Sequence, residues 1–257
     1  MSKLELKKIY MNYHTHVGET PALNNVNLNV EAGEFVSLVG PSGCGKSTIL
    51  NILAGLIKPL QGEVLFNDKL INKDFYKLDY IGYMFQQDQL FEWLDVWRNI
   101  TLGPRIQHKV TSDIFAYLEK LLKEYNLWDF RHHKPSQLSG GMRQKVALIR
   151  TLALNPQVLL LDEPFSALDY VNRLNIGNEI YAIIKNEKKT VLMVTHDIAE
   201  AVSVSDRVLV LSKRPSYVKR EVCINFSPEY PTPILRRRSP DFSGYFNSIW
   251  KEMEIND

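Results

Sequence analysis

GPSGCGKST, at residues 40–48, is the stretch that decides the fold of this chain. It follows the apolar run FVSLV at 35–39 and precedes the helix-like segment TILNILAGL. The pattern GxxxxGK[ST] between a strand and a helix binds phosphate. Its glycines let backbone N–H groups turn inward, and the helix presents its positive end to the same anion. The sequence therefore predicts a phosphate-binding loop.

The residues of this loop have different expected roles. Lys46 would reach the β- and γ-phosphates as a point charge, and the Ser47 hydroxyl would coordinate a magnesium ion. The loop residues expected to contact the nucleotide are Gly40, Ser42, Gly43, Cys44, Gly45, Lys46, Ser47 and Thr48. The motif does not by itself identify the reaction, because such loops also serve kinases, GTPases and motors.

Two apolar runs farther along the chain also end in polar residues. VLLLDE at 158–163 ends in two carboxylates, and TVLMV at 190–194 is followed closely by His196. Ligands of α/β proteins bind at the carboxyl ends of the strands. Asp162 would help to hold magnesium, Glu163 would orient or deprotonate the attacking water, and His196 would hydrogen-bond the γ-phosphate. Taken alone, the segments also fit an acidic turn and an ordinary histidine.

The remaining patterns predict an α/β core with two additions. Continuous apolar runs, at 35–39, 158–161, 191–194 and 208–211, indicate strands covered on both faces of a parallel sheet. LELKKIYMNY, ALNNVNLNVEAG and GEVLFNDKLI mix polar and apolar residues, which is typical of antiparallel strands beside the main sheet. From about Gln86 to Ala153 the pattern is helical, most clearly in DIFAYLEKLLKEYNL.

The composition narrows the class of protein. A hydrophobic share of 45% and a charged share of 23% over 257 residues are ordinary for a globular protein. A formal net charge of +2 lacks the positive potential that nucleic-acid binders use, so nucleic acid is not an expected partner. The two cysteines cannot form a disulfide framework, and no apolar stretch approaches the length that crosses a bilayer.

A second glycine-rich segment completes a pattern of motifs. LSGGMRQKVALIRTLALNP precedes the acidic strand, and SALD follows it. Ser139, Gly140 and Gly141 form a polar, flexible helix start, which is a second candidate anion site. In this order, the motifs resemble the ATPase cassette of ABC transporters. The resemblance implies that this helix start closes over ATP held by another subunit, and hence that the chain forms a head-to-tail homodimer.

The same resemblance assigns roles to single residues. Gln86, in YMFQQ, would touch magnesium or the attacking water and link the site to a membrane partner, with Gln87 as the rival assignment. Tyr13 resembles the aromatic residue that stacks on adenine, and Tyr10 lies close enough to leave the register open. Asp169, in SALD, resembles the residue that crosses the dimer interface.

The resemblance also implies a fold and its subdivision. We expect one domain over 1–257 with a P-loop NTPase (RecA-like) core sheet, an N-terminal antiparallel β-subdomain and an inserted helical subdomain. The core and β-subdomain would comprise 1–86 and 154–225. The helical subdomain would comprise 87–153, and 226–257 would form a C-terminal tail.

A finer resemblance is to importers of the nitrate, sulfonate and taurine type, which often carry LSGGM. FQQDQLFEWLDVWRNI is similar to their FQ…LLPW.TV..N segment, although Glu92 stands where proline is usual. The implied cofactors are ATP and Mg²⁺. The implied partners are permease subunits at the cytoplasmic face of the membrane and, indirectly, a solute-binding protein. The alternatives are a soluble ABC ATPase that acts on ribosomes or DNA, and a small-molecule kinase.

Overall fold

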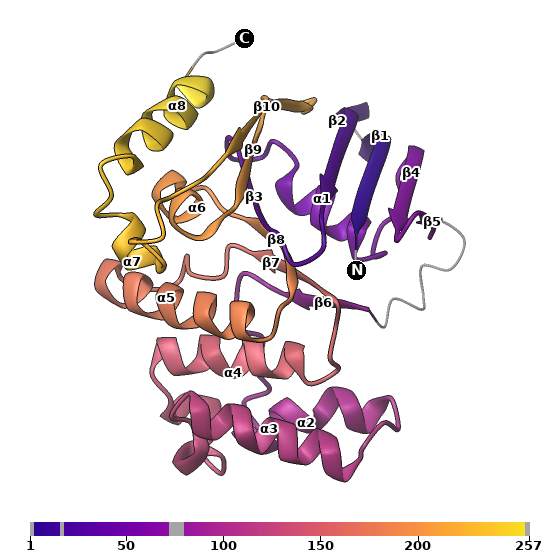
Figure 1. Cartoon of the computed structure of the whole chain (residues 1–257). Helices are drawn as coiled ribbons and strands as arrows, with labels where there is room; N and C mark the ends of the chain where they lie inside the picture. Colours follow the sequence, from indigo (N-terminus) through magenta and orange to yellow (C-terminus); the bar gives the residue numbers. More distant parts are fainter. Residues whose placement is uncertain (1–2, 16–17, 72–79, 255–257) are drawn as a thin grey trace.

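The main structural layer is a mostly parallel sheet that is covered by helices on both faces (Figure 1). The computed structural model describes residues 3–15, 18–71 and 80–254. The sheet has the strand order β10-β9-β3-β8-β7-β6, and only β10 runs antiparallel to its neighbour. Its strands are β3 (Phe35–Val39), β6 (Ile81–Met84), β7 (Val158–Asp162), β8 (Thr190–Val194), β9 (Arg207–Leu211) and β10 (Val218–Cys223). The α/β prediction is confirmed.

A smaller antiparallel sheet lies beside the main one, as the mixed N-terminal segments indicate (Figure 1). Its order is β2-β1-β4-β5, and its strands are β1 (Leu4–Thr15), β2 (Gly18–Val30), β4 (Gln61–Phe66) and β5 (Lys69–Leu70). Helix α1 (Lys46–Leu53) packs between the two sheets, because its buried side chains belong to a core cluster shared with both. The phosphate-loop helix is therefore held on two sides.

Helices cover the opposite face of the main sheet (Figure 1). These are α2 (Val96–Ile106), α3 (Ser112–Glu124), α4 (Gly140–Leu152) and α5 (Tyr170–Asn186), with short 3-10 turns at Trp128–Phe130 and Pro135–Gln137. Of these, α2 and α3 pack outside α4 rather than on the sheet itself (Figure 1). Each of the four longer helices begins at a residue whose side chain accepts a backbone N–H of the first turn. These capping residues are Asp95, Thr111, Ser139 and Asp169 respectively. Helix α4 joins the other helices to the sheet through one continuous apolar cluster.

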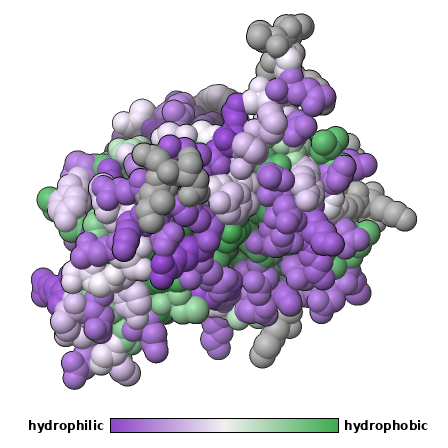
Figure 2. Space-filling view, turned by 90° about the horizontal axis from the view of Figure 1, so that it is seen from above, coloured by the Kyte–Doolittle hydropathy of each residue, from purple (hydrophilic) through white to green (hydrophobic). Residues whose placement is uncertain are grey.

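The segment expected as a C-terminal tail forms helices that pack on the core. After α6 (Ile198–Val204), helices α7 (Pro233–Arg236) and α8 (Phe242–Glu254) follow β10. Ile249 of α8 is fully buried in a cluster with residues of α6 and β9. Figure 2 shows a mostly hydrophilic face with small hydrophobic areas between the polar ones. The subdivision of the chain at 86, 153 and 225 stays a prediction.

A buried asparagine side chain holds the turn that precedes α2. Asn99 is fully buried, and its Oδ1 accepts the Phe91 N–H at 2.8 Å. Its Nδ2 is shared among the carbonyl oxygens of Phe91, Leu94 and Asp95 at 3.0–3.2 Å. A single side chain thus fixes the turn that leads into α2. The turn needs these bonds because buried backbone N–H and C=O groups must have hydrogen-bond partners.

We predict that Asn99→Ala lowers the free energy of unfolding by about 2–3 kcal/mol, because the Phe91 N–H and several carbonyls lose a buried partner. The measurement is urea unfolding followed by circular dichroism. Asn186→Ala is the matched control, since this amide is exposed and its bond to Glu124 is long, at 3.5 Å. An equal effect of both substitutions would contradict the assignment.

Candidate functional site

The phosphate loop connects the end of β3 to the start of α1. Gly43 and Gly45 have φ of +74° and +104°, which residues with a side chain rarely adopt, so these glycines permit the loop's tight turn. A Cβ on Gly45 would also lie 2.8 Å from the Leu23 side chain. Lys46 is only 7% exposed, and its Nζ donates to the carbonyl oxygens of Gly40 and Pro41 at 2.8 and 2.9 Å. Its charge is therefore fixed over the loop.

Cys44 points away from solvent within the loop. Its side chain is 1% exposed, and its Sγ lies 3.9 Å from Lys46 Nζ. Burial raises the pKa of the Cys44 thiol, and the Lys46 charge offsets part of that rise. The Cys44 sulfur packs closely against Gly40, because a Cβ on Gly40 would lie 2.9 Å from this sulfur.

Asp162 connects the end of β7 to the phosphate-loop helix. One carboxylate oxygen accepts the Ser47 hydroxyl at 3.2 Å, and the other accepts the Tyr83 hydroxyl at 3.2 Å. Burial raises the pKa of Asp162, whereas these two hydrogen bonds lower it in part. Burial and the neighbouring Asp162 also raise the pKa of Tyr83. The structure thus brings together Ser47 and Asp162, two of the three residues that the sequence assigned to magnesium, whereas the third, Gln86, contacts Glu163.

Tyr83 was missed by the sequence analysis. It lies on β6, a short strand in which buried and half-buried residues alternate, so it lacks the continuous apolar run of the central strands. The signal available was the Tyr-rich segment between the antiparallel strands and the Gln86 motif. Its pairing with β7, which places Tyr83 beside Leu160, comes from tertiary structure.

Glu163 is the meeting point of three segments. Its Oε2 accepts from Gln86 Nε2 at 3.2 Å and lies 3.0 Å from His196 Nδ1. Its φ of +45° is strained for a side chain of this size, and its N–H donates to the Val194 carbonyl at 2.9 Å. Three of the four residues predicted as catalytic, from the ends of β6, β7 and β8, therefore meet at Glu163, which contacts the other two.

The turn that carries His196 is braced by its neighbours. The Thr195 hydroxyl accepts the Asp197 N–H at 3.0 Å and donates to the carboxyl group of Glu200. Asp197 in turn caps α6 by accepting the Glu200 N–H at 3.0 Å. Glu200 is 6% exposed, and burial raises its pKa to about 7. These supporting residues were also missed, because a threonine and a glutamate near a histidine carry no distinctive sequence pattern.

The sequence left two choices open, between Gln86 and Gln87 and between Tyr13 and Tyr10, and the contacts in the structure bear on both. Gln86 reaches Glu163, whereas Gln87 lies exposed and accepts from Gln89 at 3.5 Å, so the geometry favours Gln86. The Tyr13 hydroxyl is hydrogen-bonded to Thr48 Oγ1 at 3.0 Å, and its side chain is 37% exposed. Tyr10 instead pairs with Gln61 on β4. Tyr13 is thus the tyrosine beside the phosphate-loop helix.

The second glycine segment lies at the junction of α4 and α5. Ser139 caps α4 by accepting the Met142 N–H at 3.3 Å. A Cβ on Gly141 would lie 2.5 Å from Ile176, and one on Gly140 would lie 3.2 Å from Leu168. A side chain at Gly141 would therefore displace Ile176 of α5, and one at Gly140 would press on Leu168, just before α5. Within the described parts of the chain, Ser139 makes no hydrogen bond to the phosphate loop.

Asp169 begins the neighbouring helix. It is exposed, caps α5 by accepting the Asn172 N–H at 3.1 Å, and accepts the Asn172 side-chain amide at 2.6 Å. The hydrogen bonds from Asn172 hold the pKa of Asp169 below its usual range. Ser139 and Asp169 are thus the caps of two helices that pack on each other, and both lie outside the Gln86, Glu163 and His196 cluster.

Comparison with known proteins identifies the family. A sequence profile described as "ABC transporter" matches residues 23–166, more than half of the chain. The chain belongs to the ABC transporter family. The ABC transporter ATP-binding protein YtlC of Bacillus subtilis (strain 168) is 41% identical over 253 residues, covering 98% of this chain and 96% of YtlC. The taurine import ATP-binding protein TauB of Jannaschia sp. (strain CCS1) is 36% identical over 246 residues, covering 95% and 91%.

Solved structures of ABC cassettes have the same fold. A dimeric post-hydrolysis state of the cassette MJ0796 bound to ADP and Pi is 36% identical with a TM-score of 0.74, covering 87% of this chain and all of that one. CbiO1 from Clostridium perfringens, described as part of the complex cbiONQ, is 30% identical with a TM-score of 0.75, covering 85% and 87%. The chain is thus an ATP-binding ABC ATPase of mixed α/β fold. Along the described residues, no helix combines the length and apolarity needed to span a bilayer.

We predict that alkylation of Cys44 is slow and inhibits ATP hydrolysis, whereas alkylation of the exposed Cys223 is faster and harmless. Because burial raises the pKa of the Cys44 thiol, a smaller fraction of Cys44 is thiolate at pH 8 than for an unperturbed cysteine. The labelling of Cys44 should therefore accelerate as the pH is raised above 8. ATP should protect Cys44. The measurement is iodoacetamide labelling followed by mass spectrometry, with phosphate release assayed in parallel.

A Cys223→Ser variant isolates the effect of Cys44 in this experiment. Normal ATP hydrolysis by protein that is fully modified at Cys44 would contradict the prediction. Faster labelling of Cys44 than of Cys223 would contradict the effect of burial.

Proposed function

We propose that this chain is the ATP-hydrolysing subunit of an importer, in which a head-to-tail homodimer transmits ATP binding and hydrolysis to membrane-spanning permease subunits. The observation that carries the proposal is the contact of Gln86 and His196 with one oxygen of Glu163, next to the Ser47 and Asp162 pair. A phosphate loop together with a carboxylate that is held in place from two other strand ends is suited to phosphoryl transfer to water.

Magnesium fits the oxygen donors at this place. Mg²⁺ is usually held by one or two carboxylates together with substrate phosphates, and it prefers oxygen ligands. Ser47, Asp162 and Gln86 would hold it here, because Ser47 and Asp162 already contact each other and Gln86 extends from the next strand end. When bound, the ion would neutralise phosphate charge. Among the described residues there is no cluster of three or more His, Cys, Asp and Glu side chains that points to another kind of metal site.

The chain's own residues divide the catalytic work. Glu163 would accept a proton from the attacking water or orient it, and Gln86 and His196 would hold that carboxylate in place. Lys46 would exchange its bonds to the loop carbonyls for bonds to phosphate oxygens. The loop N–H groups from Gly40 to Thr48 would supply the remaining stabilisation of negative charge. Catalysis on this account is mostly positioning and electrostatics.

A second copy of the chain would complete each nucleotide site. Ser139 caps a thirteen-residue helix that begins with Gly140 and Gly141, and the N-terminal N–H groups of this helix favour an anion. In the proposed dimer this helix start closes over the nucleotide on the partner's loop, while Asp169 crosses the interface and Tyr13 stacks on adenine. The dimeric state of the MJ0796 cassette supports this arrangement.

The permease would dock beside the segment that follows Gln86. A groove of about 410 Å³ is lined there mostly by apolar residues, including Phe85, Phe91 and Ile106, and Trp93 nearby is 71% exposed. Glu92, the departure from the usual proline, forms an ion pair with Arg143 at 2.7 Å. The groove would receive a permease segment at the cytoplasmic face of the membrane. An external solute-binding protein would deliver the solute to that permease.

The relatives named for taurine import support a small solute of the nitrate, sulfonate or taurine type. Purification of the chain from membranes tests this role. We expect a permease to co-purify, and a sulfonate or nitrate presented with its binding protein to stimulate ATP hydrolysis. Co-purification with ribosomes or DNA, and no permease, would support the alternative class instead.

We predict that Glu163→Gln binds ATP normally but hydrolyses it roughly 100- to 10,000-fold more slowly, because the group that activates water is lost. The variant should accumulate as an ATP-bound dimer in size-exclusion chromatography. Glu119→Gln is the matched control, since Glu119 lies on the surface of α3 and forms an ion pair with Lys123. Turnover by Glu163→Gln at the wild-type rate would remove Glu163 from catalysis.

A further inference from the structure

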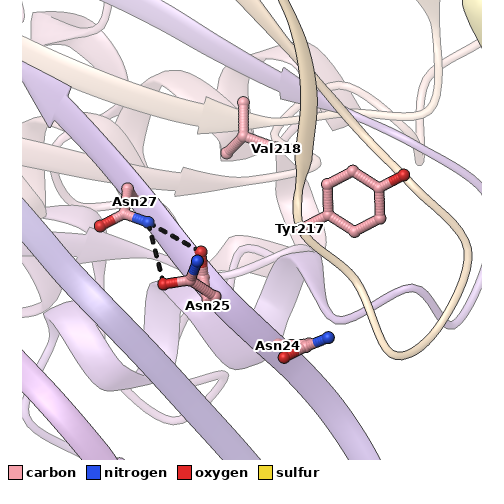
Figure 3. A pocket seen from close by; sticks show the side chains of 5 residues that line it. All are labelled: Asn24, Asn25, Asn27, Tyr217 and Val218. Atoms are coloured by element: carbon pink, nitrogen blue, oxygen red, sulfur yellow. Dashed lines mark hydrogen bonds between the residues drawn. The ribbon is translucent and has the colours of Figure 1, made fainter.

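Ser216 lies against the back of the phosphate loop although it is far from the loop in sequence. It belongs to the turn between β9 and β10, where Lys213, Arg214 and Pro215 are exposed and Ser216 is fully buried. A Cβ on Gly45 would lie only 3.3 Å from its Oγ. Figure 3 shows the next residue, Tyr217, which lines an open pocket together with Asn24 of β2. Ser216 is thus an inward-pointing residue in an otherwise exposed turn.

Backbone hydrogen bonds hold Ser216 in place independently of its side chain. Its N–H donates to the Ala22 carbonyl at 3.0 Å, and its own carbonyl accepts the Asn24 N–H at 2.9 Å. A bridge to Leu23 of β2 accompanies these bonds. The turn is therefore docked on β2 by main-chain contacts, which leaves the side-chain hydroxyl available for another partner.

That partner is the phosphate loop itself. The Ser216 hydroxyl donates to the carbonyl oxygen of Cys44, and it also lies 3.3 Å from the Ala22 carbonyl. The Cys44 carbonyl belongs to the peptide that links Cys44 to Gly45, the residue directly before Lys46. A side chain from a distant turn therefore anchors one peptide group of the loop.

The orientation of this peptide has a consequence for phosphate. Among the described residues, the single cis peptide is the one before Pro215, so the Cys44–Gly45 peptide is trans. In a trans peptide the C=O and N–H point in opposite directions. Because the Cys44 carbonyl points toward the buried Ser216, the Gly45 N–H points away from it. No hydrogen bond within the described parts of the chain uses that N–H, which leaves it available to an anion.

We propose that Ser216 is a positioning residue for nucleotide binding, which aims the Gly45 N–H at a phosphate oxygen by anchoring the Cys44 carbonyl from behind. The inference rests on the proposed function, in which this loop binds the phosphates of ATP. A free peptide between two glycine-rich turns can rotate, and a rotated carbonyl would point a negative dipole at the phosphate. The hydroxyl of Ser216 opposes that rotation, and this pre-organisation strengthens binding.

The test is the affinity of Ser216→Ala for ATP, measured by titration calorimetry with Mg²⁺ well below the unfolding temperature. We expect the dissociation constant to rise about tenfold, because one fixed peptide dipole is lost from the phosphate site. Ser216→Gly should show the same loss. Both variants should fold, since the main-chain bonds of the turn to Ala22 and Asn24 do not need the side chain.

Ser239→Ala is the matched control. Ser239 is 5% exposed and accepts the Asp241 N–H at 3.2 Å, in the turn between α7 and α8. This substitution should lower the melting temperature without changing the affinity for ATP. Wild-type affinity in Ser216→Ala, with only its melting temperature lowered, would assign a merely structural role to Ser216 and overturn the proposal.

Lys46→Ala separates this inference from the proposed function. If Lys46→Ala loses ATP binding while Ser216→Ala retains it, the loop binds nucleotide but Ser216 does not position it. If Lys46→Ala binds ATP as the wild type does, the proposed phosphate site itself is wrong. Loss of affinity in both variants supports the two assignments together.

Discussion

The need to hold polyphosphate charge in a fixed place is the constraint on which this structure depends. At the start of α1, backbone N–H groups and Lys46 supply the positive charge that holds phosphate. The ends of β6, β7 and β8 bring Gln86 and His196 to one carboxylate oxygen of Glu163. Parallel strands make this possible, because their carboxyl ends meet at one edge of the sheet. The two sheets and α1 form the support that keeps the loop rigid.

Much of this arrangement was predictable from the sequence. The phosphate loop, the acidic strand end and His196 follow continuous apolar runs, and these runs are the central strands β3, β7 and β8. Such strands are easy to predict from the sequence, since a strand that is buried on both faces of the sheet has apolar residues at nearly every position. The helix start at Ser139 was readable from the sequence too, because a cap is a local interaction, whereas the capping role of Asp169 was not predicted.

The supporting residues were not predictable, because their roles arise from contacts between distant segments. Tyr83 reaches Asp162 only after β6 pairs with β7, and Ser216 reaches Cys44 only after the β9–β10 turn docks on β2. The C-terminal helices, whose Ile249 is buried, follow no motif that the sequence analysis used. Polar side chains of these common types have no pattern that separates them from surface residues.

The central claim is that ATP lies between the phosphate loop of one subunit and the Ser139 turn of another. The most direct test mixes Ser42→Cys protein with Ser139→Cys protein, both in a Cys223→Ser background, and oxidises them with and without ATP. The account predicts a disulfide-linked dimer that forms in the mixture when ATP is present. No crosslink between the two polypeptides, in samples shown to bind ATP, would contradict it.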